Sequence, residues 1–315
     1  DSIRYLRPND RAGAATAYCP LVRQLAESRT HSHCTHRFKE KMKRMKAPTL
    51  PQAADFLAES TALYELLLPL TDEELAKPTQ FKGWSFNDVV QHLHIWNWAA
   101  NESLVDEASF MAFIKQVFSK PGQSSLKEFE REWLDNLSGK VLLDTWHSFF
   151  MEMAPRFADC DPRLRLKWAG PDMSARSSIT ARLMETWAHG QEVYDELGVT
   201  RKDEDRIKNI VILGVNTFGW TYACREQTPP GPLPRLTLTA PSGELWEFGE
   251  QSQQDCISGS ATEFCQVVTQ VRNVADTTLS VQGPVATDWM SKAQCFAGGP
   301  ENPPAPGTRF TRGAH

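Results

Sequence analysis

One stretch, residues 181–192, constrains the fold of this chain more than any other. It contains no helix breaker before Gly190, so it is expected to lie in a helix that starts at Ser177 or Ser178 and stops near Gly198. Glu185 and His189 are four positions apart within it, and residues with that spacing lie one above the other on the same helix face. A carboxylate oxygen and an imidazole nitrogen so placed can bind one divalent cation. Exposed Glu–His pairs also have this spacing, but the neighbours here are apolar: Leu183, Met184, Trp187 and Ala188.

A second helix, with an inward histidine, is expected to begin after Ser85. Ser85 is a good N-cap with an acid, Asp88, three residues later. His92 shares one helical stripe with four apolar side chains, which are Val89, Leu93, Trp96 and Ala100. His94 is two residues further on, about 200° around the helix, so the two histidines cannot face the same site. An isolated histidine on an apolar face is usually a hydrogen-bonded core residue, but beside an inward Glu–His pair it becomes the third candidate ligand.

Two histidines and one carboxylate form the ligand set of a catalytic rather than a structural metal site. They leave a divalent ion with residual positive charge and with positions open to water or substrate. Zinc is the first expectation, and nickel, iron and manganese also fit the ligand types. The predicted ligands are therefore His92, Glu185 and His189, in the core of a helical bundle.

Composition and periodicity divide the chain into two domains and two flanking segments. Residues 47–225 have helical periodicity and form the expected metal-binding bundle of four main helices, with one more helix expected over residues 205–224. Residues 233–297 combine short strand-like runs, turns and helices, which predicts a small α+β domain with an antiparallel sheet. Residues 298–315 are rich in proline and glycine and are expected to be disordered.

Residues 1–46 do not resemble the rest of the chain. They are basic, have no sustained periodicity and lack the apolar core of a secretory signal. They contain a cluster of potential metal ligands, His31, His33, Cys34 and His36. We expect a disordered upstream extension outside the folded protein. A targeting segment is the alternative, because the stretch has few acids.

Charge and cysteine usage exclude several classes of protein. The net charge is −5 and the isoelectric point is near 5.9, whereas nucleic-acid binders and proteins of anionic membrane surfaces need basic patches. No apolar run approaches the ~20 residues of a membrane span. The seven cysteines are scattered and form no C-x-x-C pair, which fits a reducing cytoplasm. These features favour a cytoplasmic protein acting on a small molecule, and they leave a homodimer open.

Two ordered sets of motifs can be compared with known proteins. The first half contains Trp84-Ser85, His92-Leu93 and Glu185-x-x-x-His189, and the second contains residues 259–264, Arg272, Val281-x-Gly283 and Trp289. The ordered set resembles the DinB-like metal-binding bundles, and within them the branch that contains mycothiol-dependent maleylpyruvate isomerase. The resemblance covers residues 47–297 and implies that His92, Glu185 and His189 hold the metal and that a sterol-carrier-like domain follows.

The resemblance also suggests a finer placement. Arg272 matches an arginine that the isomerase uses near its active site, which makes it a candidate catalytic residue. The chain looks closer to an uncharacterised metal-binding sister family of that branch, with residues 216–220 and 272–277 as its signatures.

The resulting hypothesis is an enzyme in which a metal, most simply zinc, activates a low-molecular-weight thiol such as mycothiol. The thiol would attack a small electrophile and give isomerisation or S-transfer. Arg272 would pair with a substrate carboxylate, although an arginine at a helix end can equally serve the helix dipole. Two alternatives are a metal-dependent hydrolase, for which no H-E-x-x-H base is present, and a non-catalytic metal-binding or ligand-binding protein.

Overall fold

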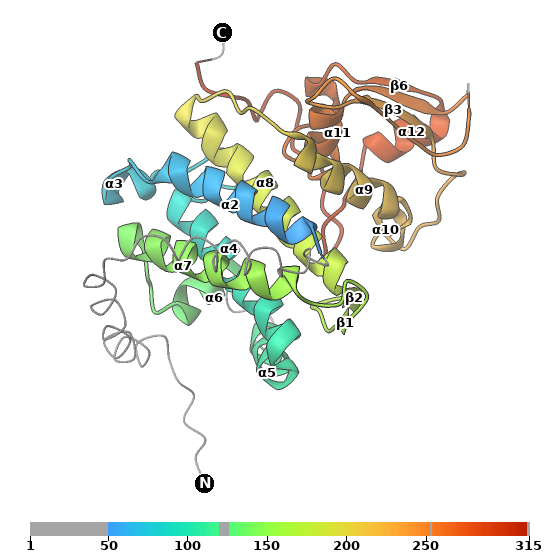
Figure 1. The fold of residues 1–315 in the computed structure, drawn as a ribbon. Coiled ribbons are helices and arrows are strands. Elements are labelled where there is room, and N and C mark those ends of the chain that lie inside the picture. The colour runs from blue at the N-terminus through green and yellow to red at the C-terminus, as the bar shows by residue number, and fades with distance from the viewer. Residues whose placement is uncertain (1–49, 120–125, 253, 314–315) are drawn as a thin grey trace, which may run out of the picture. The chain divides into compact units, whose positions relative to one another are not determined.

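The computed structural model describes residues 50–119, 126–252 and 254–313. All of them belong to one compact unit, Thr49–His315. The expected leader, residues 1–46, lies outside the described residues. A helical part comes first and is followed by a part built around a small sheet, so the fold is mixed (Figure 1).

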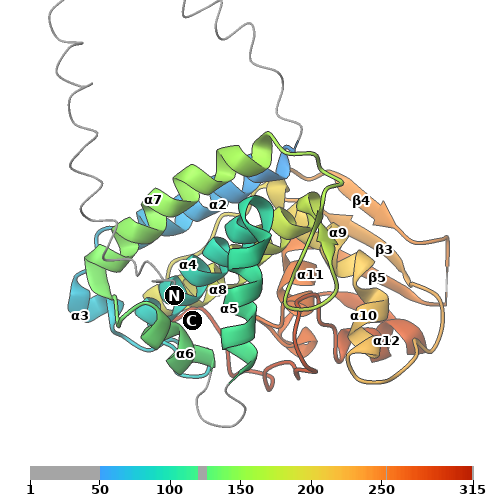
Figure 2. The same cartoon turned by 90° about the horizontal axis from the view of Figure 1, so that it is seen from below.

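Four long helices form the centre of the helical part: α2 (Gln52–Leu67), α4 (Phe86–Val105), α7 (Gly139–Ala158) and α8 (Ala175–Leu197). Both α2 and α4 pack against α7 and α8, and Figure 2 shows α2 and α7 side by side. Large buried side chains fill the space between these helices: Phe56, Phe86, Trp146, Phe150 and Phe157. Burial of each such side chain contributes about 1.5–3 kcal/mol, so this core fixes α4 and α8 relative to each other.

The two helices that carry the predicted ligands have clear sequence-encoded ends. Ser85 caps α4 through a capping box, in which its hydroxyl accepts from the Asp88 N–H and the Asp88 carboxylate accepts from the Ser85 N–H. α8 begins after Ser174, whose hydroxyl accepts from the Ser177 N–H. The helix therefore begins at Ala175, slightly before Ser177 or Ser178, where the sequence predicts its start. It ends at Gly198, which has the left-handed φ of 67° that a helix C-terminus favours.

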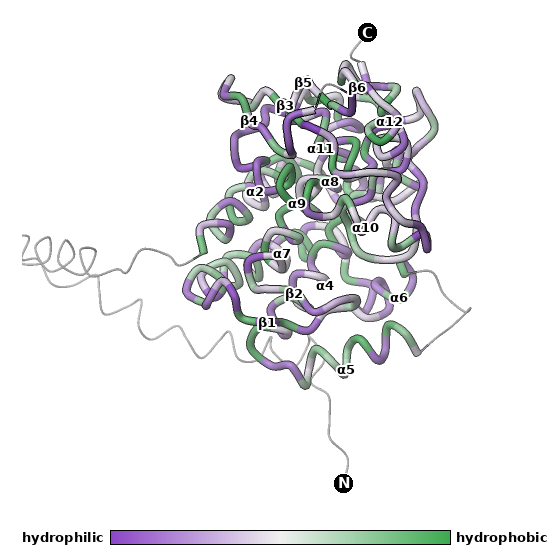
Figure 3. Tube along the Cα trace, turned by 90° about the vertical axis from the view of Figure 1, so that its right-hand side faces the viewer, coloured by the Kyte–Doolittle hydropathy of each residue, from purple (hydrophilic) through white to green (hydrophobic). Residues whose placement is uncertain are grey.

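Shorter elements complete the helical part: α3 (Asp72–Leu75), α5 (Glu107–Phe118), α6 (Leu126–Trp133), and a hairpin of β1 (Arg165–Leu166) and β2 (Met173–Ser174). Hydrophobic and hydrophilic residues alternate along α5 (Figure 3), whose buried residues are Phe110 and Phe113. No helix in the described ranges is both long and apolar enough to cross a bilayer.

The sheet has four strands in the order β4-β3-β5-β6: β3 (Arg235–Thr239), β4 (Leu245–Phe248), β5 (Cys256–Ser260) and β6 (Ser280–Gln282). β3 pairs antiparallel with β4 and parallel with β5, and β5 pairs antiparallel with β6. The sheet is therefore mixed: the prediction of an antiparallel sheet holds for two strand pairs and is wrong for β3 and β5. After β4 the chain does not form the next strand beside β4. It returns to the start of β3, where Cys256 pairs with Arg235, so β5 runs in the same direction as β3.

Six helical segments accompany the sheet in the described residues: η3 (Asp205–Ile207), α9 (Lys208–Asn216), α10 (Phe218–Ala223), α11 (Ala261–Val268), η4 (Val274–Asp276) and α12 (Pro284–Met290). The first three replace the single helix that the periodicity of residues 205–224 predicts. The break between α9 and α10 lies at Thr217, whose φ of −97° and ψ of 12° leave the helical region.

α8 belongs to two hydrophobic cores at once. Ile179 and Leu183 pack into the core of the helical part, whereas Met184 and Trp187 pack into the core of the sheet part. In Figure 1, α8 accordingly lies between α2 on one side and α9 and α11 on the other. The helix that carries two of the predicted ligands is therefore buried along both sides.

Residues 298–313 differ from the expected disordered tail, because hydrogen bonds attach them to the folded part. The Phe310 N–H donates to the Gln80 side chain over 2.9 Å, and the Arg312 N–H donates to the Asp195 carbonyl over 2.9 Å. The side chain of Asn273 donates to the Pro304 carbonyl. Composition alone could not reveal this order, because the partners are distant in sequence.

Candidate metal centre

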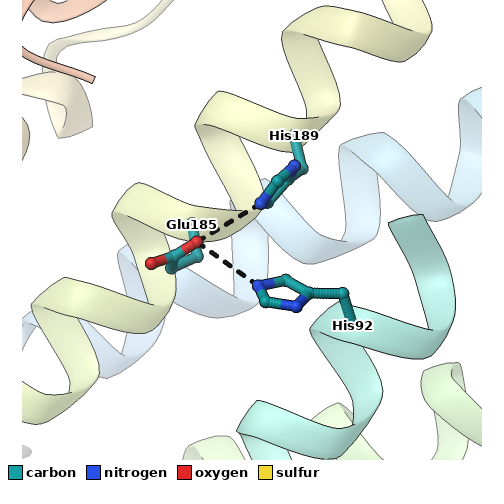
Figure 4. A group of neighbouring side chains, drawn as sticks. All are labelled: His92, Glu185 and His189. Atoms are coloured by element: carbon teal, nitrogen blue, oxygen red, sulfur yellow. Dashed lines mark ion pairs between the residues drawn. The ribbon is translucent and has the colours of Figure 1, made fainter. Parts of the chain in front are cut away.

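The three predicted ligands lie together. Glu185 and His189 project from one face of α8, and His92 projects toward them from α4 (Figure 4). The Oε2 atom of Glu185 is 3.4 Å from the His189 Nε2 and 3.7 Å from the His92 Nε2. One potential ligand atom from each residue lies within 4.8 Å of the other two. Two ligands of a tetrahedral ion with bonds of about 2.1 Å are about 3.4 Å apart, so the spacing fits a small divalent cation.

Each imidazole is oriented by a second carboxylate. The His92 Nδ1 lies 2.8 Å from the Glu130 Oε1, which also accepts the Trp96 indole N–H over 2.9 Å. The His189 Nδ1 lies 3.2 Å from the Glu192 Oε2. A carboxylate on Nδ1 leaves Nε2 directed at Glu185, which is the arrangement of metal-binding histidines.

Burial and charge shift the pKa values of all three groups. Burial alone would raise the pKa of Glu185, but hydrogen bonds to His189 and His92 hold it well below its ordinary value. Burial opposes protonation of His189, yet the charge of Glu192 and hydrogen bonds to both carboxylates raise its pKa to about 10. Burial also opposes protonation of His92, but the charge of Glu130 and the hydrogen bonds to Glu130 and Glu185 together raise its pKa. A cation that binds here must displace these protons.

Aromatic rings enclose the imidazoles. The Trp84 indole stacks on His189 with a centroid distance of 5.6 Å and an interplanar angle of 3°. It meets His92 edge-on at 5.3 Å, and Phe81 meets His189 edge-on at 5.3 Å. These contacts limit rotation of both imidazoles and exclude water from one side of the cluster.

His94 takes no part in the cluster, as its position on the helix predicts. It packs edge-on against Phe149 at 5.4 Å, and its Nδ1 is buried without a hydrogen-bond partner among the residues that the structure describes. Burial lowers the pKa of His94 to about 4. The two neighbouring histidines of α4 therefore have opposite environments.

Arg272, the predicted catalytic residue, has a partner on α8. Its Nη1 and Nη2 atoms donate to the two carboxylate oxygens of Asp195 over 2.7 and 2.6 Å. Among the described residues, the cluster of potential metal ligands consists of His92, Glu185 and His189. The role of Arg272 as a clamp for a substrate carboxylate stays a prediction.

Three polar residues of the centre have no role in the sequence-based prediction. Glu192 and Arg182 lie three residues beyond His189 and three before Glu185, so helical spacing would have placed both near the ligands. Glu130 comes from α6, and no spacing rule links that helix to α4. Only the three-dimensional structure could identify it.

Comparisons with known proteins place the chain in a family. Residues 56–194, which include the three clustered side chains, match the model of the mycothiol maleylpyruvate isomerase N-terminal domain. Uncharacterised proteins from two strains of Mycobacterium tuberculosis are each 34% identical over 250 residues, covering 79% of this chain and 96% of the relative. The chain belongs to the mycothiol-dependent maleylpyruvate isomerase superfamily.

Solved structures of that superfamily are more distant in sequence. The crystal structure of the mycothiol-dependent maleylpyruvate isomerase is 12% identical, with a TM-score of 0.49, covering 74% of this chain and 94% of that chain. The structure of a mutant of the mycothiol-dependent maleylpyruvate isomerase is 14% identical, with a TM-score of 0.45, covering 69% of this chain and 86% of that chain.

Proposed function

We propose that this protein is a metal-dependent enzyme that uses a low-molecular-weight thiol of the mycothiol type as co-substrate. The observation that carries the proposal is the convergence of the Nε2 atoms of His92 and His189 on the Glu185 carboxylate. Membership of the mycothiol-dependent superfamily supports the thiol. We further assign residues 47–225 to a DinB-like four-helix bundle and residues 233–297 to a sterol-carrier-like domain.

The chain's own residues have distinct roles in this proposal. His92, Glu185 and His189 hold a divalent ion, for which zinc is the first candidate, and they leave positions open for a further ligand. Glu130 and Glu192 hold the imidazoles in the orientation that binds the ion. A bound ion would supply Lewis-acid chemistry, lowering the pKa of a thiol that reaches it.

A thiol from outside the protein is favoured over a protein thiol. Cys295 is buried. Its burial and, to a lesser extent, the negative charge of Glu185 both raise the pKa of its thiol. Cys265 is also buried, and burial raises its pKa well above the ordinary value. Because the thiolate is the nucleophilic form, neither side chain suits the role.

In the proposed reaction the thiol of the co-substrate loses its proton and the thiolate adds to one carbon of a conjugated C=C bond of a small substrate. The C–S bond forms as the π electrons of the double bond move onto the conjugated carbonyl group. In an isomerisation the C–C bond, now single, rotates, the electrons return to it, and the C–S bond breaks to release the thiolate. In an S-transfer the C–S bond persists and the neighbouring carbon takes up the proton that the thiol lost. The class of enzyme is therefore an isomerase or a transferase.

The test is a turnover screen of small electrophiles with zinc-loaded protein and one of three thiols: mycothiol, bacillithiol or glutathione. We expect turnover that requires both zinc and one thiol and that falls at least ~100-fold in Glu185→Gln, because loss of a ligand should cost at least as much as the ~10- to 100-fold typical of groups that orient ligands. His94→Gln, on α4 but directed away from the centre, is the matched control and should keep activity. Turnover that needs zinc but no thiol would favour the hydrolase instead.

A further inference from the structure

Residues 78–85 form a short hairpin beside the metal centre. Its first and last residues are bridged as in an antiparallel pair, and the Trp84 N–H donates to the Phe81 carbonyl over 2.8 Å across the turn. The two residues between them have positive φ values of 50° and 69°, which is the conformation of tight hairpin turns. The hairpin thereby holds the rings of Phe81 and Trp84 against His189.

The hairpin is attached to the C-terminal segment, residues 298–313. The side-chain amide of Gln80 makes two hydrogen bonds with the backbone of Phe310: it donates to the carbonyl over 2.9 Å and accepts from the N–H over 2.9 Å. The guanidinium of Arg309 lies over the Phe81 ring, 4.8 Å from its centroid. Gln80 and Phe310 are 230 positions apart, so this attachment is independent of the local folding of the hairpin.

The C-terminal segment is in turn anchored to the rest of the fold. The Thr311 hydroxyl donates to the Asp195 carboxylate over 2.9 Å. The Arg309 Nη1 donates to the Gln270 carbonyl over 3.0 Å, so this side chain contacts both the anchor and the hairpin. The position of the hairpin over the centre therefore depends on a segment that is fixed elsewhere.

The centre beneath the hairpin is nearly closed to solvent, whereas the space outside the hairpin is open. The side chains of His92, Glu185 and His189 are 11%, 18% and 10% exposed. A Cβ atom on Gly83, in the turn, would meet no heavy atom of the described residues within 4 Å. The turn therefore has room to move outward, and this movement would uncover the imidazoles.

We propose that the C-terminal segment is a latch that holds the hairpin closed and so controls access to the three side chains of the metal centre. The inference rests on the proposed function, because the ligands that need access are the ion and the thiol co-substrate. The two hydrogen bonds between Gln80 and Phe310 lie at the surface, where water competes for the same groups, so the latch can open transiently. Weakening it should raise the rates of ion uptake and ion release by the same factor, since the ligands themselves do not change.

The experiment compares zinc exchange in the full-length wild type, in Gln80→Met and in the control Gln116→Met. Gln80→Met keeps the length of the side chain but removes both hydrogen bonds, and Gln116 is exposed on α5. Release is measured with a chelator at concentrations where the rate no longer depends on the chelator, and uptake by stopped flow. We expect both rates to rise about 5- to 20-fold in Gln80→Met, as for loss of two hydrogen bonds, with an unchanged zinc Kd and Tm. Gln116→Met should match the wild type.

Modification of histidines by diethyl pyrocarbonate tests the latch in the metal-free protein. We expect His92 and His189 to react about 5- to 20-fold faster in Gln80→Met than in the wild type, again as for loss of two hydrogen bonds. His94 faces Phe149 and not the centre, so its rate should not change. Peptide mass spectrometry measures the three rates.

Three results would overturn the latch. They are equal zinc exchange in Gln80→Met and wild type, equal modification of His92 and His189, or faster zinc release with unchanged uptake. The last result would mean that the contacts support the geometry of the ligands and not access to them. Zinc content tests the proposed function separately: zinc-loaded protein with unchanged exchange contradicts only the latch, whereas a wild type that binds no zinc but shows faster modification in the variant contradicts only the proposed function.

Discussion

At the scale of single residues, His92 and His94 show how position on one helix decides chemistry. The charge of Glu130 raises the pKa of His92, whereas burial lowers that of His94 to about 4. The helical period predicts that only one of them can face the ligands. The helical period could not predict Glu130, because this residue lies on α6; its carboxylate favours the protonated form of His92.

His94 should make stability depend on pH in the acidic range. Its pKa is about 4 in the folded state and about 6.5 unfolded, so between these values the unfolded chain binds more protons. The free energy of unfolding should therefore fall by up to about 3 kcal/mol as the pH drops from ~6.5 to ~4. Denaturant unfolding at several pH values measures this loss, and His94→Leu should reduce it. An equal loss in the variant would contradict the assignment.

Metal binding should be coupled to proton release. In the metal-free protein the pKa of His189 is raised to about 10, so at neutral pH a cation must displace its proton. The apparent zinc affinity should then rise about tenfold or more per pH unit between pH 6 and 8. Competition titrations with a chelator of known pH dependence measure this slope. A pH-independent affinity would show that the cation does not compete with these protons.

At the scale of elements, the sequence predicts the ends of helices that carry capping residues better than it predicts breaks within a helix. The Ser85 capping box places α4 correctly, and Gly198 ends α8 where the sequence predicts. The break at Thr217 and the short β1–β2 hairpin carry no strong local signal, because packing against other elements determines them. The parallel pairing of β3 with β5 likewise depends on a long-range contact.

Loss of the α4 cap should destabilise the protein without removing a ligand. Ser85→Ala deletes the acceptor of the Asp88 N–H and should lower the free energy of unfolding by about 1 kcal/mol. Ser85→Thr keeps a hydroxyl at this position and should lose less. Denaturant unfolding of the three proteins measures the difference; equal stability of Ser85→Ala and wild type would mean that the cap contributes nothing.

At the scale of the whole molecule, Asp195 connects three distant segments. Its carboxylate on α8 accepts from Arg272 of the sheet part and from the Thr311 hydroxyl of the C-terminal segment, and its carbonyl accepts from the Arg312 N–H. These partners lie 77 and 116 positions away for the two side-chain contacts. Composition predicts a disordered C-terminal tail, whereas these hydrogen bonds hold Thr311 and Arg312 against α8.

Removing one partner of the Asp195–Arg272 pair should lower the free energy of unfolding more than replacing both partners. Arg272→Met leaves a buried carboxylate without its main partner and should lower the free energy of unfolding by about 3–5 kcal/mol. In the double variant Asp195→Leu/Arg272→Met both charges are gone, so part of that stability should return. A double-mutant cycle in denaturant measures the coupling. Additive losses would show that the two groups do not interact.

The central claim is that His92, Glu185 and His189 hold a divalent ion. The most direct test is the metal content of the purified full chain, measured by plasma mass spectrometry beside a His92→Ala/Glu185→Ala/His189→Ala variant, with His94→Ala as the control. We expect about one equivalent of zinc or another divalent metal in the wild type and the control, and a loss of it in the triple variant. No metal in the wild type after reloading, or equal metal in the triple variant, would contradict the claim.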